Sequence, residues 1–261
     1  MHRSLAPLVA VALAAGSATA QESRPEGTVW SVGLGVLSAP RPYVGASNTT
    51  VPIPLFQLRT GRLSIDGIRA SYRLAGDRRL HLDAVAGFDF SGLKASDSPF
   101  LAGMQDRDPT VELGLAAVLD RARWGGVVWL RQDVLGRSGG HRAGFDLALR
   151  RVLLDGRLLL LPGLGLEWQS GDRVDYYYGV RPLEALPTRP SYRPGAALNL
   201  SATAVASYRL GPSLDLVSIV RMERLDGEIT ASPIVDRQWS WFGLVGLTWR
   251  MGGATGGPPS G

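Results

Sequence analysis

The sequence of 261 residues contains no cysteine and a single lysine, Lys94, so 27 of its 28 basic residues are arginine. Disulfide and thiolate chemistry are therefore excluded. Only two histidines, His81 and His141, follow the first twenty residues. Beyond those twenty residues there is no run of about 18 apolar residues, so we expect no membrane-spanning helix. No cluster of about five to eight basic residues occurs either, which argues against a nucleic-acid partner.

The first twenty residues have the pattern of a secretory signal peptide. His2 and Arg3 precede an apolar run over 5–15, and small residues follow at 18–20. Because this run is too short to cross a bilayer, we predict signal-peptide-dependent export and not a membrane anchor. The remaining chain divides into a folded domain over 21–251 and a Gly- and Pro-rich tail over 252–261, which we expect to be disordered.

The preference for arginine has two explanations that the sequence leaves open. The guanidinium group forms bidentate pairs with carboxylates and phosphates, so arginine is suited to contact with phosphorylated lipid or acidic glycan. Alternatively, a GC-rich genome encodes arginine where other genomes encode lysine.

The strongest pattern in the chain is alternation of apolar and polar residues with a period of two. It is clearest over 79–91 and 197–208, and it recurs in segments of similar length. Tight turns alternate with long polar loops at 39–50, 92–109, 170–194 and 226–238, and tryptophans lie close to the segment ends. These features predict an all-β fold, an antiparallel up-and-down transmembrane β-barrel of the Gram-negative outer membrane.

The strand count depends on one segment. The alternating segments are 29–38, 51–59, 62–74, 79–91, 110–119, 124–135, 141–153, 157–168, 196–210, 213–225 and 239–251. That count is odd, whereas bacterial single-chain barrels have even numbers of strands. Within 62–74 the apolar phase changes at Asp66-Gly67, so a turn there gives twelve strands. We predict twelve, with ten as the alternative.

No catalytic, cofactor-binding or metal-binding site is predicted. His81 and Asp83 could orient an imidazole as the base of a lipid-hydrolysing barrel enzyme, but we favour a lumenal ion-pair network with Arg69 or Arg79. The residues expected to form this polar network are Arg69, His81, Asp83, Asp89, Arg221 and Glu223. Asp106 and Asp108 flank Arg107 without the spacing of a calcium loop, so we expect that loop to neutralise its own charge.

Six loop and strand motifs occur in an order that resembles one family. They are SAPRPYVGASN, VPIPLFQLRTGRLSIDG, LAGMQDRDPTVELG, YYYGVRPLEA, PSYRPG and SPIV. The residues that carry the resemblance are Tyr43, Gly45, Pro52, Pro54, Gly103, Met104, Arg107, Tyr177, Tyr178, Gly179, Tyr192, Ser232 and Pro233. From about residue 30 to 249 the chain is similar to the MltA-interacting protein (MipA/OmpV) family of outer-membrane proteins.

The resemblance implies a non-enzymatic scaffold that links a lytic transglycosylase with a penicillin-binding protein in peptidoglycan metabolism. A channel for solute uptake or an adhesin is the alternative. Outer-membrane lipid and lipopolysaccharide are the surroundings that it implies. The signature residues are expected to be structural. The Tyr176–Val180 segment shows no helix or strand pattern, so we expect it in a long loop, as a loop-folding cluster in which Gly179 permits a tight turn. An aromatic docking site for glycan or a partner protein is the other interpretation.

Overall fold

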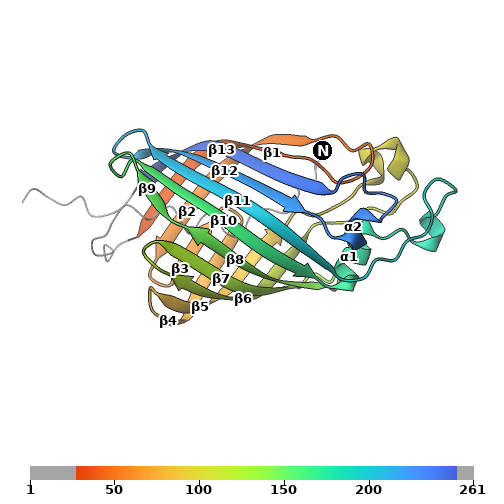
Figure 1. Cartoon of the computed structure of the whole chain (residues 1–261), viewed down its shortest axis with the longest axis horizontal. Helices are drawn as coiled ribbons and strands as arrows, with labels where there is room; N and C mark the ends of the chain where they lie inside the picture. Colours follow the sequence, from red (N-terminus) through yellow and green to blue (C-terminus); the bar gives the residue numbers. More distant parts are fainter. Residues whose placement is uncertain (1–27, 252–261) are drawn as a thin grey trace, which may run out of the picture.

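The computed structural model describes residues 28–251, so the predicted signal peptide and tail lie outside the described residues. The chain forms a single antiparallel sheet (Figure 1). Its strands are β1 (Val29–Ala39), β2 (Thr49–Thr60), β3 (Leu63–Asp66), β4 (Arg69–Gly76), β5 (Leu80–Asp89), β6 (Thr110–Asp120), β7 (Trp124–Asp133), β8 (His141–Leu149), β9 (Arg151–Leu153), β10 (Leu158–Gln169), β11 (Ala197–Arg209), β12 (Leu214–Arg224) and β13 (Trp239–Met251). Within 28–251, no helix has the length and apolarity needed to cross a membrane.

The sheet closes into a barrel of twelve strands. β1 pairs with both β2 and β13, and β10 pairs with β11, which completes the ring. β8 and β9 both pair with β10 and are one strand line interrupted at Arg150. The change of phase at Asp66-Gly67 is a turn that separates β3 from β4. The predicted twelve-strand antiparallel barrel is therefore confirmed.

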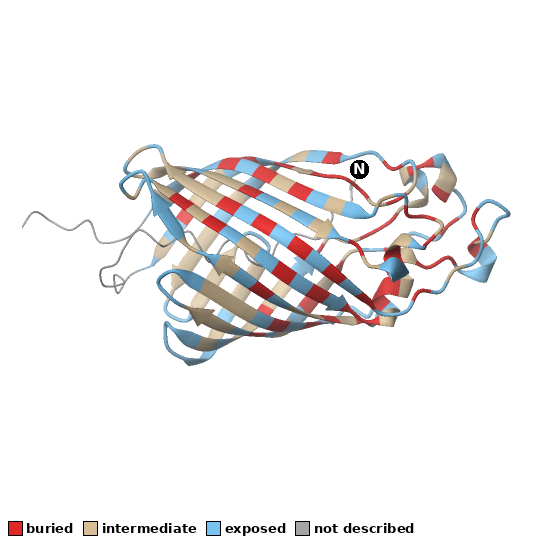
Figure 2. Cartoon of the chain, in the orientation of Figure 1, coloured by how far each residue is buried: buried red, intermediate tan, exposed pale blue. Residues whose placement is uncertain are grey.

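Burial alternates along the strands as a membrane barrel requires (Figure 2). In β11, Leu198 and Leu200 are 53% and 49% exposed, whereas Asn199 and Ser201, which alternate with them, are 2% and 3% exposed. The apolar side chains thus face outward and the polar ones face the lumen. Because a closed sheet pairs its backbone groups internally, its outer face is suited to hydrocarbon.

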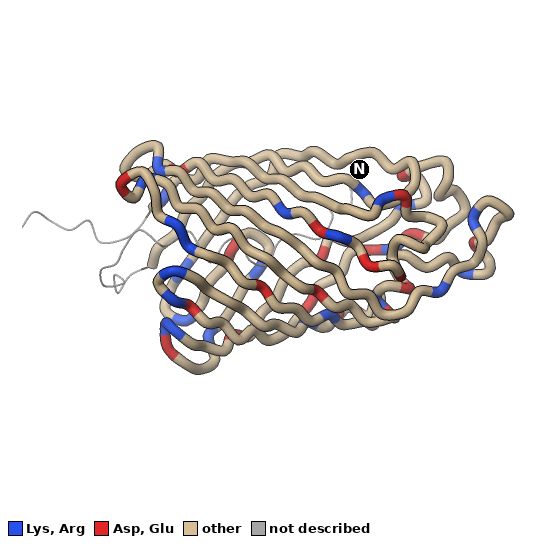
Figure 3. Tube along the Cα trace, in the orientation of Figure 1, with Lys and Arg blue, Asp and Glu red and all other residues tan. Residues whose placement is uncertain are grey.

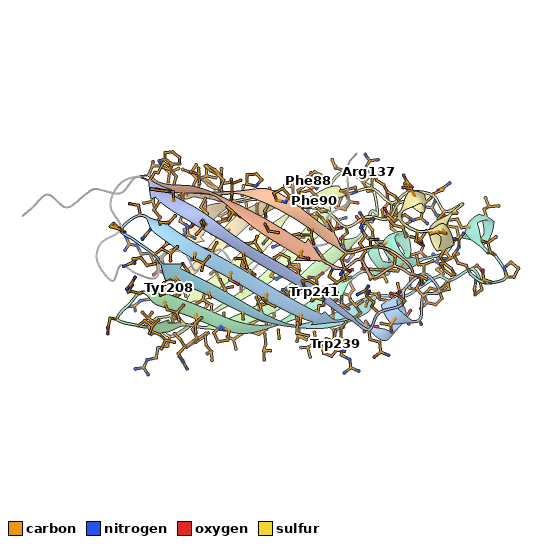
Figure 4. The ribbon with its side chains drawn as sticks, turned by 90° about the horizontal axis from the view of Figure 1, so that it is seen from above. Phe88, Phe90, Arg137, Tyr208, Trp239 and Trp241 are labelled. Carbon is orange, nitrogen blue, oxygen red and sulfur yellow. The ribbon has the colours of Figure 1, made fainter. Side chains whose placement is uncertain are left out.

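The two ends of the barrel differ. Short turns join the strands at one end, and loops 40–48, 90–109, 170–196 and 225–238 lie at the other (Figure 1). Three exposed tryptophans mark each end: Trp30, Trp124 and Trp249 at the short turns, and Trp168, Trp239 and Trp241 at the loops. Figure 4 shows Tyr208 toward the short turns and Trp241 toward the loops. These belts match the aromatic girdles of outer-membrane barrels, whose short turns face the periplasm.

The lumen is less polar than the sequence suggested. Side chains from β1, β10, β11, β12 and β13 form an apolar cluster inside the barrel that includes Leu37, Leu161, Val205, Ile219 and Phe242. The charged lumenal side chains come mainly from β5 to β8, β10 and β12. The lumen is therefore polar along only part of its wall.

The β3–β4 hairpin is short, so the first half of β2 pairs with β1 on one side and has no strand on the other. β3 pairs only with Gln57–Thr60 of β2. The carbonyl oxygen of Phe56 accepts a hydrogen bond from the N–H of Gly67. The backbone N–H and C=O groups of even-numbered β2 residues therefore point away from β1, toward the β3–β4 hairpin. Pro52 and Pro54 share that direction. Because proline has no N–H, they remove two donors that would otherwise lack a partner.

Candidate functional site

The four long loops fold together over one mouth of the barrel, and we call this assembly the loop cap (40–48, 90–109, 170–196 and 225–238). It contains the short helices η1 (Ala95–Asp97), η2 (Pro99–Leu101), α1 (Gly171–Tyr178), η3 (Pro182–Glu184) and α2 (Gly227–Thr230). The cap has its own apolar core. That core includes Tyr43, Leu93, Leu101, Met104, Val174, Val180, Ile229 and Ile234, with Tyr178 and Tyr192 packed against it.

The tyrosine block is the centre of the loop cap. Tyr176, Tyr177 and Tyr178 form the last residues of α1, so the expectation of a segment without helix is wrong. An α-helix leaves its last four carbonyl groups without intrahelical partners. The carbonyl of Asp175 accepts from the N–H of Gly179. The next three carbonyls need partners from elsewhere.

Each of these three carbonyls accepts a hydrogen bond from a different loop. The Nε of Arg107 in loop 90–109 donates to Tyr176 O at 2.7 Å. The hydroxyl of Tyr43 in loop 40–48 donates to Tyr177 O at 3.3 Å. The hydroxyl of Ser232 in loop 225–238 donates to Tyr178 O at 2.6 Å. The end of α1 is thus the point at which all four loops are joined.

The tyrosine rings also pack between the loops. Tyr177 is 1% exposed, and Tyr178 lies 6.0 Å from Tyr43 between ring centroids. The hydroxyl of Tyr176 accepts from the N–H of Asp108 at 2.9 Å. Burial raises the pKa of Tyr43, Tyr177 and Tyr178 above the ordinary value, so these hydroxyls stay neutral and can donate. This geometry is that of the loop-folding cluster.

Arg107 makes a second connection inside the loop cap. Its Nη2 lies 3.0 and 2.9 Å from the two carboxylate oxygens of Glu184 in loop 170–196. The side chains are 1% and 4% exposed. Asp106 instead accepts a hydrogen bond from the N–H of Ala95, and Asp108 forms a salt bridge with Arg137. The expectation that Arg107 is neutralised by its neighbouring aspartates is therefore wrong. Its partner is Glu184, which is distant in sequence but buried beside it.

The other signature residues have backbone or packing positions in or beside the cap. Gly45 and Gly103 have φ values of 70° and 84°, a region that favours glycine. Gly179 has a φ of −74°, so it does not make a tight turn through positive φ. A Cβ atom at this position would lie 2.4 Å from the carbonyl oxygen of Asp175. Glycine is therefore required here because the backbone of Asp175 leaves no room for a side chain. The hydroxyl of Tyr192 donates to Glu228 O at 2.9 Å. Pro233 is half-buried beside Ser232.

Below the cap, charged side chains cross the lumen. Arg173 of α1 points into the barrel, and its Nη2 lies 2.7 Å from Asp89 of β5. Its Nη1 lies 3.5 Å from Glu112 of β6. Burial disfavours the charge of Arg173, but Asp89 and then Glu112 raise its pKa above the ordinary value. Helix α1 is therefore attached to the barrel wall by a fully ionised arginine.

A second arginine continues this network on the wall. Nη2 of Arg142 in β8 lies 2.6 Å from Glu112, and its Nη1 lies 3.2 Å from Glu167 in β10. All three side chains are at least nine-tenths buried. Four members of this network were not predicted from the sequence: Arg142, Glu112, Glu167 and Arg173. Alternation alone indicated that the three strand residues face the lumen, but no local pattern indicated Arg173.

The structure brings only some of the predicted network together. Asp89 pairs with Arg173, Arg221 lies 3.8 Å from Asp146, and Glu223 accepts from Asn199 at 3.0 Å. Arg69 lies on β4 opposite Asp66. His81 and Asp83 form a separate pair of 3.5 Å near the short turns. Over residues 28–251, no group of three or more His, Asp or Glu is arranged to hold a metal ion.

Glu184 gives the loop cap an expected pH dependence. Burial opposes ionisation, but the N–H groups of Gln105 and Arg181 and the guanidinium of Arg107 outweigh it, and they hold the pKa of Glu184 below its ordinary 4.5. A lowered carboxyl pKa stabilises the fold above the ordinary pKa, and this contribution is lost as pH falls through the lowered one. We expect amide hydrogen exchange of residues 181–186, corrected for intrinsic rates, to be constant down to about pH 5 and to accelerate below it.

The matched control for this pH dependence is Glu184→Gln. It retains the acceptor oxygen but cannot titrate, so its exchange should show a weaker dependence below pH 5. Equal pH dependence in the two proteins would show that Glu184 does not control the cap.

The chain is similar to several known proteins. A family model described as "MltA-interacting protein MipA" matches residues 32–251. The chain is 28% identical over 248 residues to the MltA-interacting protein of Escherichia coli (strain K12), covering 93% of this chain and 96% of that protein. It is 32% identical over 148 residues to outer membrane protein OmpV of Vibrio cholerae, covering 56% and 55%. Among solved structures, the translocator domain of autotransporter NalP from Neisseria meningitidis aligns over 91% of this chain and 92% of that chain, with a TM-score of 0.45 and 11% identity.

Proposed function

Because this chain belongs to the MltA-interacting protein MipA family, we propose that it is a capped, non-conducting outer-membrane barrel that serves as a docking scaffold in peptidoglycan metabolism. In this role it links a lytic transglycosylase with a murein synthase, a penicillin-binding protein. The name of the Escherichia coli relative, MltA-interacting protein, supports this choice of partner. The protein itself has no enzymatic role in this proposal.

The observation that carries the proposal is the occupied mouth of the barrel. The loop cap has a buried core, and α1 projects Arg173 into the lumen, where it contacts Asp89 and Glu112. A solute path through this end would have to displace buried ion pairs, whose separation is costly. A capped barrel presents its outer wall and its short-turn end to other envelope proteins, and the short-turn end faces the periplasm, where murein enzymes act.

The test combines recovery of partners with electrical measurement. Crosslinking in intact envelopes, followed by purification of the full chain, should recover a lytic transglycosylase in stoichiometric amounts. The same purified protein in a planar bilayer should give no steady, salt-dependent current. Recovery without current supports the scaffold. Steady current with no murein enzyme recovered would overturn it in favour of a solute channel.

A further inference from the structure

Basic charge is concentrated at one end of the barrel. The segments at the short-turn end contain twelve arginines and five aspartates: Arg59, Arg62, Arg73, Arg78, Arg79, Arg121, Arg123, Arg150, Arg151, Arg157, Arg209 and Arg250 against Asp77, Asp83, Asp120, Asp155 and Asp215. The loops at the other end, 40–48, 90–109, 134–140, 170–196 and 225–238, contain nine basic and nine acidic residues. Figure 3 shows the basic segments gathered at the short turns. Overall composition therefore does not explain the asymmetry.

Six of these arginines are exposed and lie on three successive short-turn hairpin ends: on the turns between β4 and β5, β6 and β7, and β9 and β10, and at the first residue of β9. We call this set the arginine arc: Arg78, Arg79, Arg121, Arg123, Arg151 and Arg157. Among the described residues, none of the six guanidinium groups forms a salt bridge. The nearby carboxylates have other partners, since Asp77 accepts from the N–H groups of Arg79 and Leu80, and Asp120 pairs with Arg150.

The arginine arc lies at the level of the aromatic belt. Arg123 directly precedes the exposed Trp124. The guanidinium of Arg157 lies 5.4 Å from the ring centroid of Tyr208, which Figure 4 shows at the short-turn end. Leu154, in the same turn as Arg157, is 60% exposed. Arginines beside outward-facing aromatic and leucine side chains are placed where lipid headgroups begin.

We propose that the arginine arc binds the phosphate groups of anionic phospholipids in the periplasmic leaflet. The arc supplies what this ligand needs: planar donors that form bidentate contacts with phosphate and are in no salt bridge, and adjoining apolar side chains for the acyl chains. Its position beside the lipid-facing belt favours a lipid over an acidic protein. This inference goes beyond the scaffold role and does not depend on it.

Native mass spectrometry of the full chain in detergent tests the site. The protein is offered equal amounts of phosphatidylglycerol and phosphatidylcholine with identical acyl chains. We expect preferential retention of phosphatidylglycerol. Each arginine near an anionic surface changes affinity about fivefold, so Arg78→Gln, Arg123→Gln and Arg151→Gln together should lower phosphatidylglycerol affinity by about 100-fold at low salt. The corresponding triple lysine variant keeps the positive charge but lacks the planar guanidinium group. Its affinity for phosphatidylglycerol should lie between those of the wild type and the triple glutamine variant.

The matched control removes three exposed arginines from the loop end: Arg137→Gln, Arg193→Gln and Arg224→Gln. Its lipid retention should equal that of the wild type, and heat-modifiable gel mobility should show that both triple variants are folded. Inorganic phosphate at equal concentration should displace little lipid if the site takes a membrane headgroup, and full displacement would indicate a site for free phosphate. Equal retention of phosphatidylglycerol by the glutamine variant of the arc and the glutamine variant of the loop end would overturn the proposal. Displacement of the lipid by polyglutamate would also overturn it.

Discussion

Arg173→Ala is expected to release helix α1 from the lumen and to open the barrel to ions. The side chains of Arg173 and Asp89 are 3% and 0% exposed, and their closest atoms are 2.7 Å apart. Removing one partner of a buried ion pair costs about 3–5 kcal/mol, because the remaining charge is left buried without compensation. Asp89 and Glu112 would both lose Arg173, so the attachment of loop 170–196 should fail before the barrel does.

Limited proteolysis is the direct measurement. Loop 170–196 should become a cleavage site in Arg173→Ala, while the strands stay protected and heat-modifiable mobility is retained. In a planar bilayer the variant should conduct and prefer cations, because the carboxylate of Asp89, freed from Arg173, then lines the path. Arg193→Ala is the control, since Arg193 is exposed in the same loop. A loop that resists protease as well as the wild type does would show that Arg173 does not hold the cap.

The same variant separates two explanations for a silent wild type. A barrel closed only by α1 should conduct once Arg173 is removed. A barrel closed also by the apolar lumenal cluster of Leu37, Leu161 and Phe242 should become protease-sensitive but stay silent. Either result is compatible with the scaffold proposal, whereas a conducting wild type is not.

The barrel was predictable from sequence because its two environments alternate residue by residue. The lipid face favours apolar side chains and the lumenal face favours polar ones. The residue types of Leu198 and Asn199 alone therefore indicate which face each occupies, whatever strand pairs with them. The count of twelve followed from one local event, the change of phase at Asp66-Gly67. Apolar lumenal side chains such as Phe242 were missed, since a residue that is apolar on the inner face weakens the alternation instead of strengthening it.

The loop cap was not predictable, because its contacts join residues far apart in sequence. Arg107 and Glu184 are separated by 77 positions, and nothing near either residue indicates the other. Helix α1 is only eight residues long, a length at which an isolated helix is marginal in water. It depends on hydrogen bonds that Tyr43, Arg107 and Ser232 donate to its last carbonyls. The family motifs identified those donors without indicating their common acceptor.

Arg142→Met is expected to destabilise the barrel itself. Arg142 donates to Glu112 at 2.6 Å and to Glu167 at 3.2 Å, and all three side chains are at least nine-tenths buried. The variant removes the closest charged partner of both Glu112 and Glu167, which stay buried, so we expect a loss of about 3–5 kcal/mol in the free energy of unfolding. Urea unfolding in phospholipid vesicles, followed by tryptophan fluorescence, measures it. Arg150→Met is the control, because its pair with Asp120 is 24% and 45% exposed and should contribute less than about 1 kcal/mol.

A second substitution distinguishes loss of a charge partner from loss of packing. The double variant Arg142→Met with Glu112→Met removes both charges of the closest pair. Glu167 still accepts from Gln169, and Arg173 still pairs with Asp89. The double variant should therefore be more stable than the sum of the two single losses predicts, with a coupling energy of about 2–3 kcal/mol. Additive losses would mean that Arg142 stabilises the barrel by filling space. The lumenal network would then stabilise the barrel through packing and not through ion pairing.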